Sequence, residues 1–261
     1  MIVFLVVSFL ASIVGAICGI GGGVVIKPVL DMLRLESVAA ISFLSNCTVL
    51  SMSCYSVGKA MLGRDGQVDL KTGTPLALGA AVGGLTGRQL FTGIQSLFAN
   101  QNAVGAVQAA CLGVITVGTL FYKLYKSKIK TRGTENQAAC LGIGLVLGIL
   151  SSFLGIGGGP INLVVLHYFF SMDTKKAATN SLYVILFSQL ASLGTALATR
   201  TVPSFQPFAL ALMIAGGIGG GIVGRIFNRR IDSRTVDKLF LALMALIILI
   251  CVYNVFHNLS V

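Results

Sequence analysis

The uncharged stretches of this chain decide what it can fold into. Most approach the ~20 residues that an α-helix needs to span the ~30 Å hydrocarbon core of a bilayer. Their residues do not alternate between polar and apolar, as the strands of a membrane β-barrel would. Only 10% of the 261 residues are charged, whereas a soluble domain carries about 25%. We therefore predict an all-α integral membrane protein. Eight segments lack Lys, Arg, Asp and Glu: Met1–Cys18, Ile41–Val57, Thr74–Leu85, Val104–Tyr122, Ala138–Leu154, Ala177–Ala198, Pro207–Val223 and Leu239–Val255.

Residues that could carry other functions are few and scattered. The net charge of +11 would suggest nucleic-acid binding in a soluble protein, but Lys and Arg of membrane proteins gather in cytoplasmic loops. The six cysteines have no CxxC spacing and no histidine partner. His167 and His257 are far apart in the sequence, and no nucleophile stands next to a base. We predict no nucleic-acid partner, no metal, no cofactor and no enzymatic activity. Met1–Cys18 lacks the basic start and cleavage site of a signal peptide.

An internal repeat organises the chain. The letters GIGGG start at Gly19 and again at Gly155, 136 residues later. Two further pairs of segments recur at nearly the same offset: AISFL (40–44) with ATNSL (178–182), and GGLTGR (83–88) with GGIVGR (220–225). We therefore predict two copies of one unit, residues 1–125 and 137–261, joined by a basic cytoplasmic linker over 126–136.

The Lys and Arg residues indicate how the copies are oriented. With four crossings per copy, the two sides of the membrane would hold nine and ten of them. If each GIGGG segment instead turns back within the membrane, fifteen of the nineteen share one side, and only Lys27, Arg34, Arg88 and Arg200 remain opposite. Such a bias marks the cytoplasmic side. The prediction is two inverted repeats, each with a glycine-broken re-entrant hairpin plus three transmembrane helices, and both termini periplasmic.

The glycine break itself is the candidate binding site. Consecutive glycines end a helix and expose backbone N–H groups, which are tolerated in a membrane only where protein, water or a ligand satisfies them. The helix that follows starts inside the bilayer, and its N-terminus attracts anions. Tight helix packing by small residues is the alternative explanation. We predict that a small anion is bound by Gly21, Gly22, Gly23 and Val24 in the first copy and by Gly157, Gly158 and Gly159 in the second.

Polar side chains near the breaks are further candidates. Asn46, Asn180 and Ser181 lie near the starts of two apolar helices, and Asn162 follows the second glycine turn. Their donors could orient an anion, although interhelical hydrogen bonding is an equally good explanation.

Charged side chains at equivalent repeat positions carry weaker expectations. Arg88 and Arg225 could guide anions, but snorkelling to the lipid headgroups is the favoured explanation. Asp31 and His167 could couple transport to protons, but an exposed Asp31 beside Arg34 and an interfacial His167 are the ordinary explanations. Lys27 either snorkels outward or adds positive charge to an anion path.

These paired motifs resemble the sulfite exporter TauE/SafE family of membrane permeases. The resemblance is carried by Gly19–Gly23 with Pro28 after it, by the stretch GIGGGPINL from Gly155, and by the two other segment pairs. It implies a bacterial inner-membrane carrier for sulfite, thiosulfate or an organosulfonate such as sulfoacetate. These small oxyanions suit a site made of backbone amides.

We therefore expect a secondary transporter that works by alternating access. An anion channel, or a transporter of another small carboxylate or oxyanion, is the alternative. The partners expected are the substrate and the lipid bilayer; a coupling ion, H⁺ or Na⁺, and a homodimer are left open.

Overall fold

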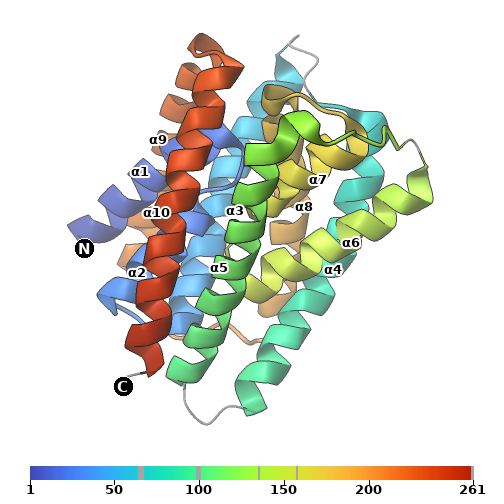
Figure 1. Cartoon of the computed structure of the whole chain (residues 1–261). Helices are drawn as coiled ribbons and strands as arrows, with labels where there is room; N and C mark the ends of the chain where they lie inside the picture. The colour runs from blue at the N-terminus through green and yellow to red at the C-terminus, as the bar shows by residue number, and fades with distance from the viewer. Residues whose placement is uncertain (64–67, 98–100, 135, 157, 260–261) are drawn as a thin grey trace.

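The computed structural model describes residues 1–63, 68–134, 136–156 and 158–259 apart from 98–100, and the regular secondary structure of this part is all helical (Figure 1). The predicted all-α class is confirmed. A short 3-10 helix, Lys126–Lys128, follows the fifth α-helix. The α-helices are α1 Ile2–Cys18, α2 Gly23–Leu33, α3 Val38–Leu62, α4 Leu70–Leu97, α5 Gln101–Tyr125, α6 Gln137–Leu154, α7 Pro160–Phe170, α8 Thr174–Ala198, α9 Pro207–Arg230 and α10 Ser233–Leu259.

Six helices in the described part of the chain are long and apolar enough to cross a membrane: α3, α5, α6, α8, α9 and α10. The sequence also predicted six crossings, but with α4 in place of α6. Helix α4 is 28 residues long and is not among the six, whereas α6, expected as the first arm of a hairpin, is. Helices α1 and α7 are apolar but shorter.

Matching local signals start and stop the helices of the two halves. Gly19 ends α1 and Gly155 ends α6, each in the left-handed conformation that glycine adopts without strain (φ 73° and 63°). Ser37 caps α3 by accepting from the backbone N–H of Ala40, and Asp173 caps α8 by accepting from that of Lys176.

Helix packing repeats between the halves as well. Helix α1 packs on α9 and α6 packs on α4; α3 packs on α9 and α8 packs on α4; α2 packs on α10 and α7 packs on α5. Helices α3 and α8 pack on each other. In each pair, the second contact joins the counterparts of the helices that make the first contact, where α1 to α5 correspond in order to α6 to α10.

Glycines at four-residue spacing let the tilted helices approach closely. A methyl group placed on Gly216, Gly220 or Gly224 of α9 would lie 2.9, 2.4 or 2.5 Å from a backbone carbonyl oxygen of α1. The equivalent glycines of α4, at 79, 83 and 87, meet carbonyl oxygens of α6 in the same way. Small residues at this spacing are typical of close contacts between membrane helices.

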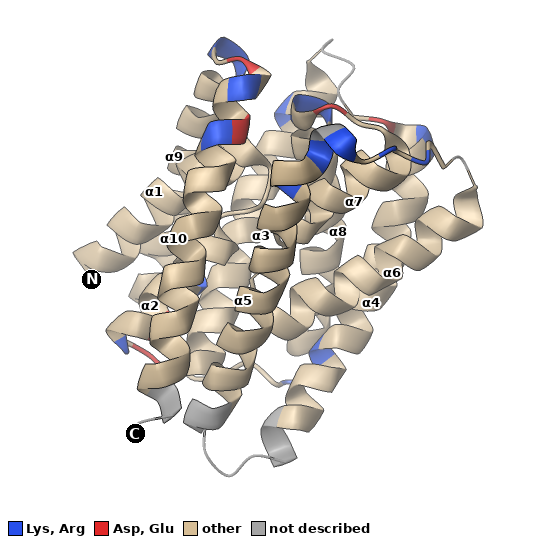
Figure 2. Cartoon of the chain, in the orientation of Figure 1, with Lys and Arg blue, Asp and Glu red and all other residues tan. Residues whose placement is uncertain are grey.

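Basic residues gather at one end of the helix assembly (Figure 2). This end carries the linker between α5 and α6 and the loops before α8 and α10, whereas the opposite end shows few basic residues (Figure 2). Lys123 and Asp237 form an ion pair there, with 2.6 Å between nitrogen and oxygen. Arg64, counted with this side in the sequence, lies outside the described residues.

Candidate functional site

The two glycine turns meet inside the protein. A methyl group on Gly23 would lie 1.9 Å from the carbonyl oxygen of Ile156, and one on Gly158 would lie 3.4 Å from that of Ile20. Both isoleucines are at most 2% exposed. The structure thus brings together the two segments that the sequence singled out. Gly157, also predicted for the site, lies outside the described residues.

Each turn also packs on the start of a long helix from the opposite half. A methyl group on Gly19 would lie 2.2 Å from Cα of Ala178, and one on Gly155 would lie 2.7 Å from Oγ of Ser42. Ser42 and Ala178 are 136 residues apart, the same offset as the two glycines. The sequence alignment had paired Ser42 with Asn180, two residues further on. Close packing therefore explains Gly19 and Gly155 by itself.

The first turn presents unpaired donors. The backbone N–H groups of Gly21, Gly22, Gly23 and Val24 have no hydrogen-bond acceptor within the described residues. Two buried hydroxyls beside the turn are also unpaired. Ser12 Oγ would be 3.0 Å from a methyl on Gly22, and Ser45 Oγ 3.0 Å from one on Gly23. Buried donors without acceptors are destabilising, and an anion is the ligand that would satisfy several of them together.

The second turn holds a small cavity whose lining is mainly apolar. Asn162 is 2% exposed, its backbone N–H donates to Gly159 O, and its Oδ1 has no partner. It lines a cavity of about 10 Å³ together with Ser151, Gly158, Gly159 and Pro160. That volume accommodates about one water molecule, so a sulfur oxyanion does not fit in this conformation.

Helices α3 and α8 add a polar interior to the site. Their buried polar atoms without partners in the described structure belong to Ser45, Asn46, Ser53, Ser56, Ser181, Ser188, Gln189 and Ser192. Asn46 and Ser181 were predicted; the glutamine and the later serines were missed, although their three-, four- and seven-residue spacing along apolar helices was a visible signal. Such groups are normally paired with protein or water, so this region suits a polar solute.

Asn180 has a different environment from the other predicted side chains. Its Oδ1 accepts from the backbone N–H of Asp69 at 2.9 Å, and its Nδ2 donates to Lys176 O. Lys176 also pairs with the Asp69 carboxylate at 3.3 Å. Asn180 therefore ties the start of α8 to the start of α4.

The two equivalent arginines lie in hollows lined by different residues. Arg225 donates to Ser56 O and lines one hollow with Thr179, Asn228 and Arg229. Arg88 donates to Thr201 O and lines another, of about 290 Å³, with threonines of α4 and α8. Arg88 is only 8% exposed, so its side chain packs against protein.

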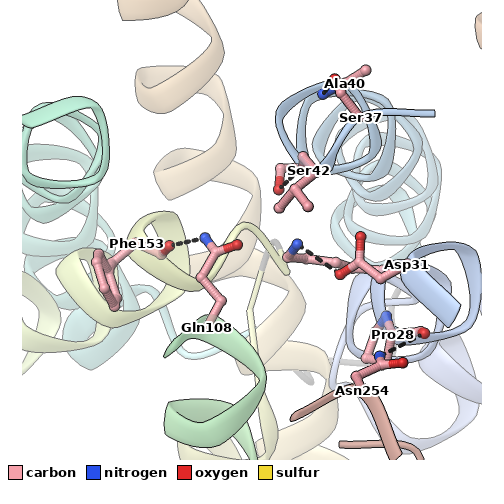
Figure 3. Close-up of polar contacts among 10 residues, drawn as sticks. Pro28, Asp31, Ser37, Ala40, Ser42, Gln108, Phe153 and Asn254 are labelled. Atoms are coloured by element: carbon pink, nitrogen blue, oxygen red, sulfur yellow. Dashed lines mark hydrogen bonds and ion pairs between the residues drawn. The ribbon is translucent and has the colours of Figure 1, made fainter. Parts of the chain in front are cut away.

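A buried ion pair is the charged feature that the sequence did not predict (Figure 3). Lys27 Nζ lies 2.9 Å from Asp31 Oδ2, and the two side chains are 4% and 11% exposed. The expectation of an exposed Asp31 beside Arg34 is therefore wrong, and Lys27 does not reach outward. His167, at the position equivalent to Asp31, is half-buried and its Nδ1 hydrogen-bonds Tyr122 Oη at 2.9 Å.

Comparisons with known proteins agree with this architecture. The model of the family described as sulfite exporter TauE/SafE matches residues 4–250. The "probable membrane transporter protein YunE" of Bacillus subtilis (strain 168) is 24% identical over 268 residues, covering 94% of this chain and 95% of the relative. No solved structure matches. In the described residues, no group of three or more His, Cys, Asp or Glu side chains could hold a metal ion.

Proposed function

Because this chain belongs to the sulfite exporter TauE/SafE family of membrane transporters, we propose that it carries a small sulfur-containing anion across the bacterial inner membrane. The substrate class is sulfite, thiosulfate or an organosulfonate. The observation that carries the proposal is the meeting of the two glycine turns, with four unpaired backbone N–H groups on the first.

The proposed site lies between the two turns. Gly21, Gly22, Gly23 and Val24 provide amides at the positive N-terminal end of α2. On the other side, Gly158, Gly159 and Asn162 lie at the N-terminal end of α7. Ser45, Asn46 and Ser181 supply neutral polar groups, which orient an oxyanion without the desolvation cost of a full charge. We also propose Gly157 as a binding residue, on the basis of its position in the second GIGGG motif alone.

Transport requires the turns to separate. Their contact at Gly23 and the small cavity at Asn162 leave no room for an oxyanion, so this conformation is closed around the site. We propose alternating access between inverted repeats, residues 1–125 and 137–261, with the linker 126–136 cytoplasmic and both termini periplasmic. The hollows lined by Arg225 and Arg88 suit approach paths for anions. A coupling ion, H⁺ or Na⁺, and a homodimer are compatible with this mechanism.

An anion channel is the second candidate, since it would share the amide site. The tight contact between the turns favours a carrier, because a channel needs a continuous pore. Saturable flux with substrate exchange across the membrane supports a carrier; unsaturable flux supports a channel.

The test is a binding panel on purified protein with sulfite, thiosulfate, sulfate, sulfoacetate and taurine. Ser45→Ala removes an unpaired hydroxyl beside Gly23, so the fold should persist while binding weakens about 10- to 100-fold, the value of a hydrogen bond to a charged group. Ser8→Ala is the matched control, because the buried Ser8 hydroxyl donates to Phe4 O within its own helix. Unchanged binding in Ser45→Ala places the site elsewhere; no binding by the wild type contradicts the function.

A further inference from the structure

The Lys27–Asp31 ion pair stands beside the second glycine turn, although both residues belong to α2. Cδ of Lys27 would lie 3.7 Å from a methyl group on Gly155. Ionisable residues inside a membrane protein are expensive and normally functional. A buried pair is also a poor source of stability, because desolvation offsets most of the attraction.

A water-sized cavity adjoins this pair. Lys27, Asp31, Gln108 and Asn254 are among the residues that line about 10 Å³ of space. Gln108 of α5 donates through Nε2 to Phe153 O at 2.7 Å, which fixes its side chain against the last turn of α6. Its Oε1 and Asp31 Oδ1 are buried and have no partner within the described residues. Figure 3 shows Gln108 on the side of Asp31 from which the ion-pair contact to Asp31 comes. Two residues of one cavity lining thus each have a buried acceptor without a partner, which points to a bound proton donor.

Other groups packed around Asp31 do not replace Lys27 as its partner. Helix α10 brings Cys251 and Asn254, whose Nδ2 donates to Pro28 O at 2.9 Å. Arg34, beyond the end of α2, donates instead to the carbonyl oxygen of His257. Helix α3 brings the Ser42 hydroxyl, which donates to Val38 O. Helix α1 contributes no Lys, Arg, Asp or Glu.

From this geometry we propose that the Lys27 ammonium group exchanges its partner during transport, from the Asp31 carboxylate to the transported anion. Asp31 takes up a proton when the anion takes its place beside Lys27. This inference rests on the proposed function. In the empty carrier the pair is neutral. An anion at the turn draws the ammonium group away and leaves a buried carboxylate unpaired, which is strongly destabilising. A proton from water neutralises it, so the anion and the proton bind together.

Linkage fixes the sign of the pH dependence. If the loaded carrier holds one more proton than the empty one, the apparent Kd rises by up to about tenfold for each pH unit of increase. Binding is therefore tightest at low pH. Sulfite itself takes up a proton in this range, so the informative quantity is the difference in pH slope between wild type and variant, which cancels the ligand's own titration.

The experiment measures the same anion panel at several pH values on three variants. Asp31→Asn leaves Lys27 free to pair with the anion, so binding should be tighter than in the wild type. The apparent Kd should then change with pH only through the titration of the ligand. Lys27→Gln combined with Asp31→Asn gives a neutral pair that avoids an unpaired buried charge; binding should weaken at least about tenfold, and its pH dependence should again come only from the ligand. Asp237→Asn, which breaks the Lys123–Asp237 pair at the basic end, is the control and should keep the wild-type slope.

The outcomes separate the two proposals. If the wild type binds no anion of the panel, the proposed function fails and this inference fails with it. If the wild type binds an anion with the same pH slope as both Asp31 variants, only this inference is overturned. Should Asp31→Asn not fold, the double variant gives the answer alone.

Discussion

Asp69 shows how one side chain secures the basic end of the molecule. It lies just before α4, where burial raises the pKa of its carboxyl group. Hydrogen bonds from the Thr72 backbone N–H and from Lys176, together with the Lys176 charge, outweigh that effect, so the pKa is lowered. The contact joins the starts of α4 and α8. Asn180 of α8 joins them as well, by accepting a hydrogen bond from the backbone N–H of Asp69.

Acid should weaken this contact. A carboxyl group with a lowered pKa in the folded state stabilises the fold above its unfolded pKa of about 3.9, and this contribution is lost as the pH falls through the folded value. For a largely exposed pair it amounts to at most about 1 kcal/mol. Thermal unfolding in detergent from neutral pH to about pH 3 should show a smaller loss for Asp69→Asn than for the wild type. Equal losses would show that the charge of Asp69 does not contribute to stability.

The glycines of α9 differ by the helix face they occupy. Gly220 faces α1, where an added methyl group would lie 2.4 Å from Phe9 O. Gly219, its neighbour, would meet only the Phe9 ring, at 3.4 Å. Backbone atoms of a packed helix cannot yield as a side chain can, so only the first position demands glycine.

These two positions provide a matched pair of variants. Gly220→Val should force α1 and α9 apart and destabilise the protein by about 1–3 kcal/mol or more, as overpacked cores do. Gly219→Val adds the same volume and should change the stability far less. Thermal unfolding of both purified variants measures the difference. Similar midpoints would mean that α1 and α9 do not pack as closely as described.

The sequence was sufficient to predict the helical elements because caps, glycines and uncharged runs are local signals. It also predicted that the two GIGGG segments act together, because a repeat is visible without coordinates. It could not predict contacts across the fold. Gln108 meets Phe153, Asn254 meets Pro28 and Asn180 meets Asp69 through tertiary packing. The environment of Asp31 was missed for this reason: it depends on α5 and α10, far along the chain.

At the scale of the whole molecule, the clustering of basic residues sets an expectation for orientation. The end with the 126–136 linker should be cytoplasmic, because Lys and Arg in short loops resist translocation. Figure 2 shows the C-terminal end of α10 on the opposite side from this cluster, so the C-terminus should be periplasmic.

Reporter fusions in a bacterial host test this orientation. Alkaline phosphatase joined after residue 259 should be active, because it folds in the periplasm. Green fluorescent protein joined after residue 130 should fluoresce, because that site is cytoplasmic. The reversed pair of results would contradict the orientation, whereas two sites on the same side of the membrane would contradict the inverted repeat.

The repeated helix contacts, with the ion pair on α2 alone, have one more consequence. If the two halves were identical, the inward-open and outward-open forms of the proposed carrier would have equal energy. The anion would then bind equally well from either side of the membrane. Lys27 and Asp31 have Leu163 and His167 at the corresponding places, so we expect the two forms of the proposed carrier to differ in energy. Such a difference would make the apparent affinity for the anion differ between the two sides of the membrane, while the gradients of the anion and the proton would set the direction of net transport.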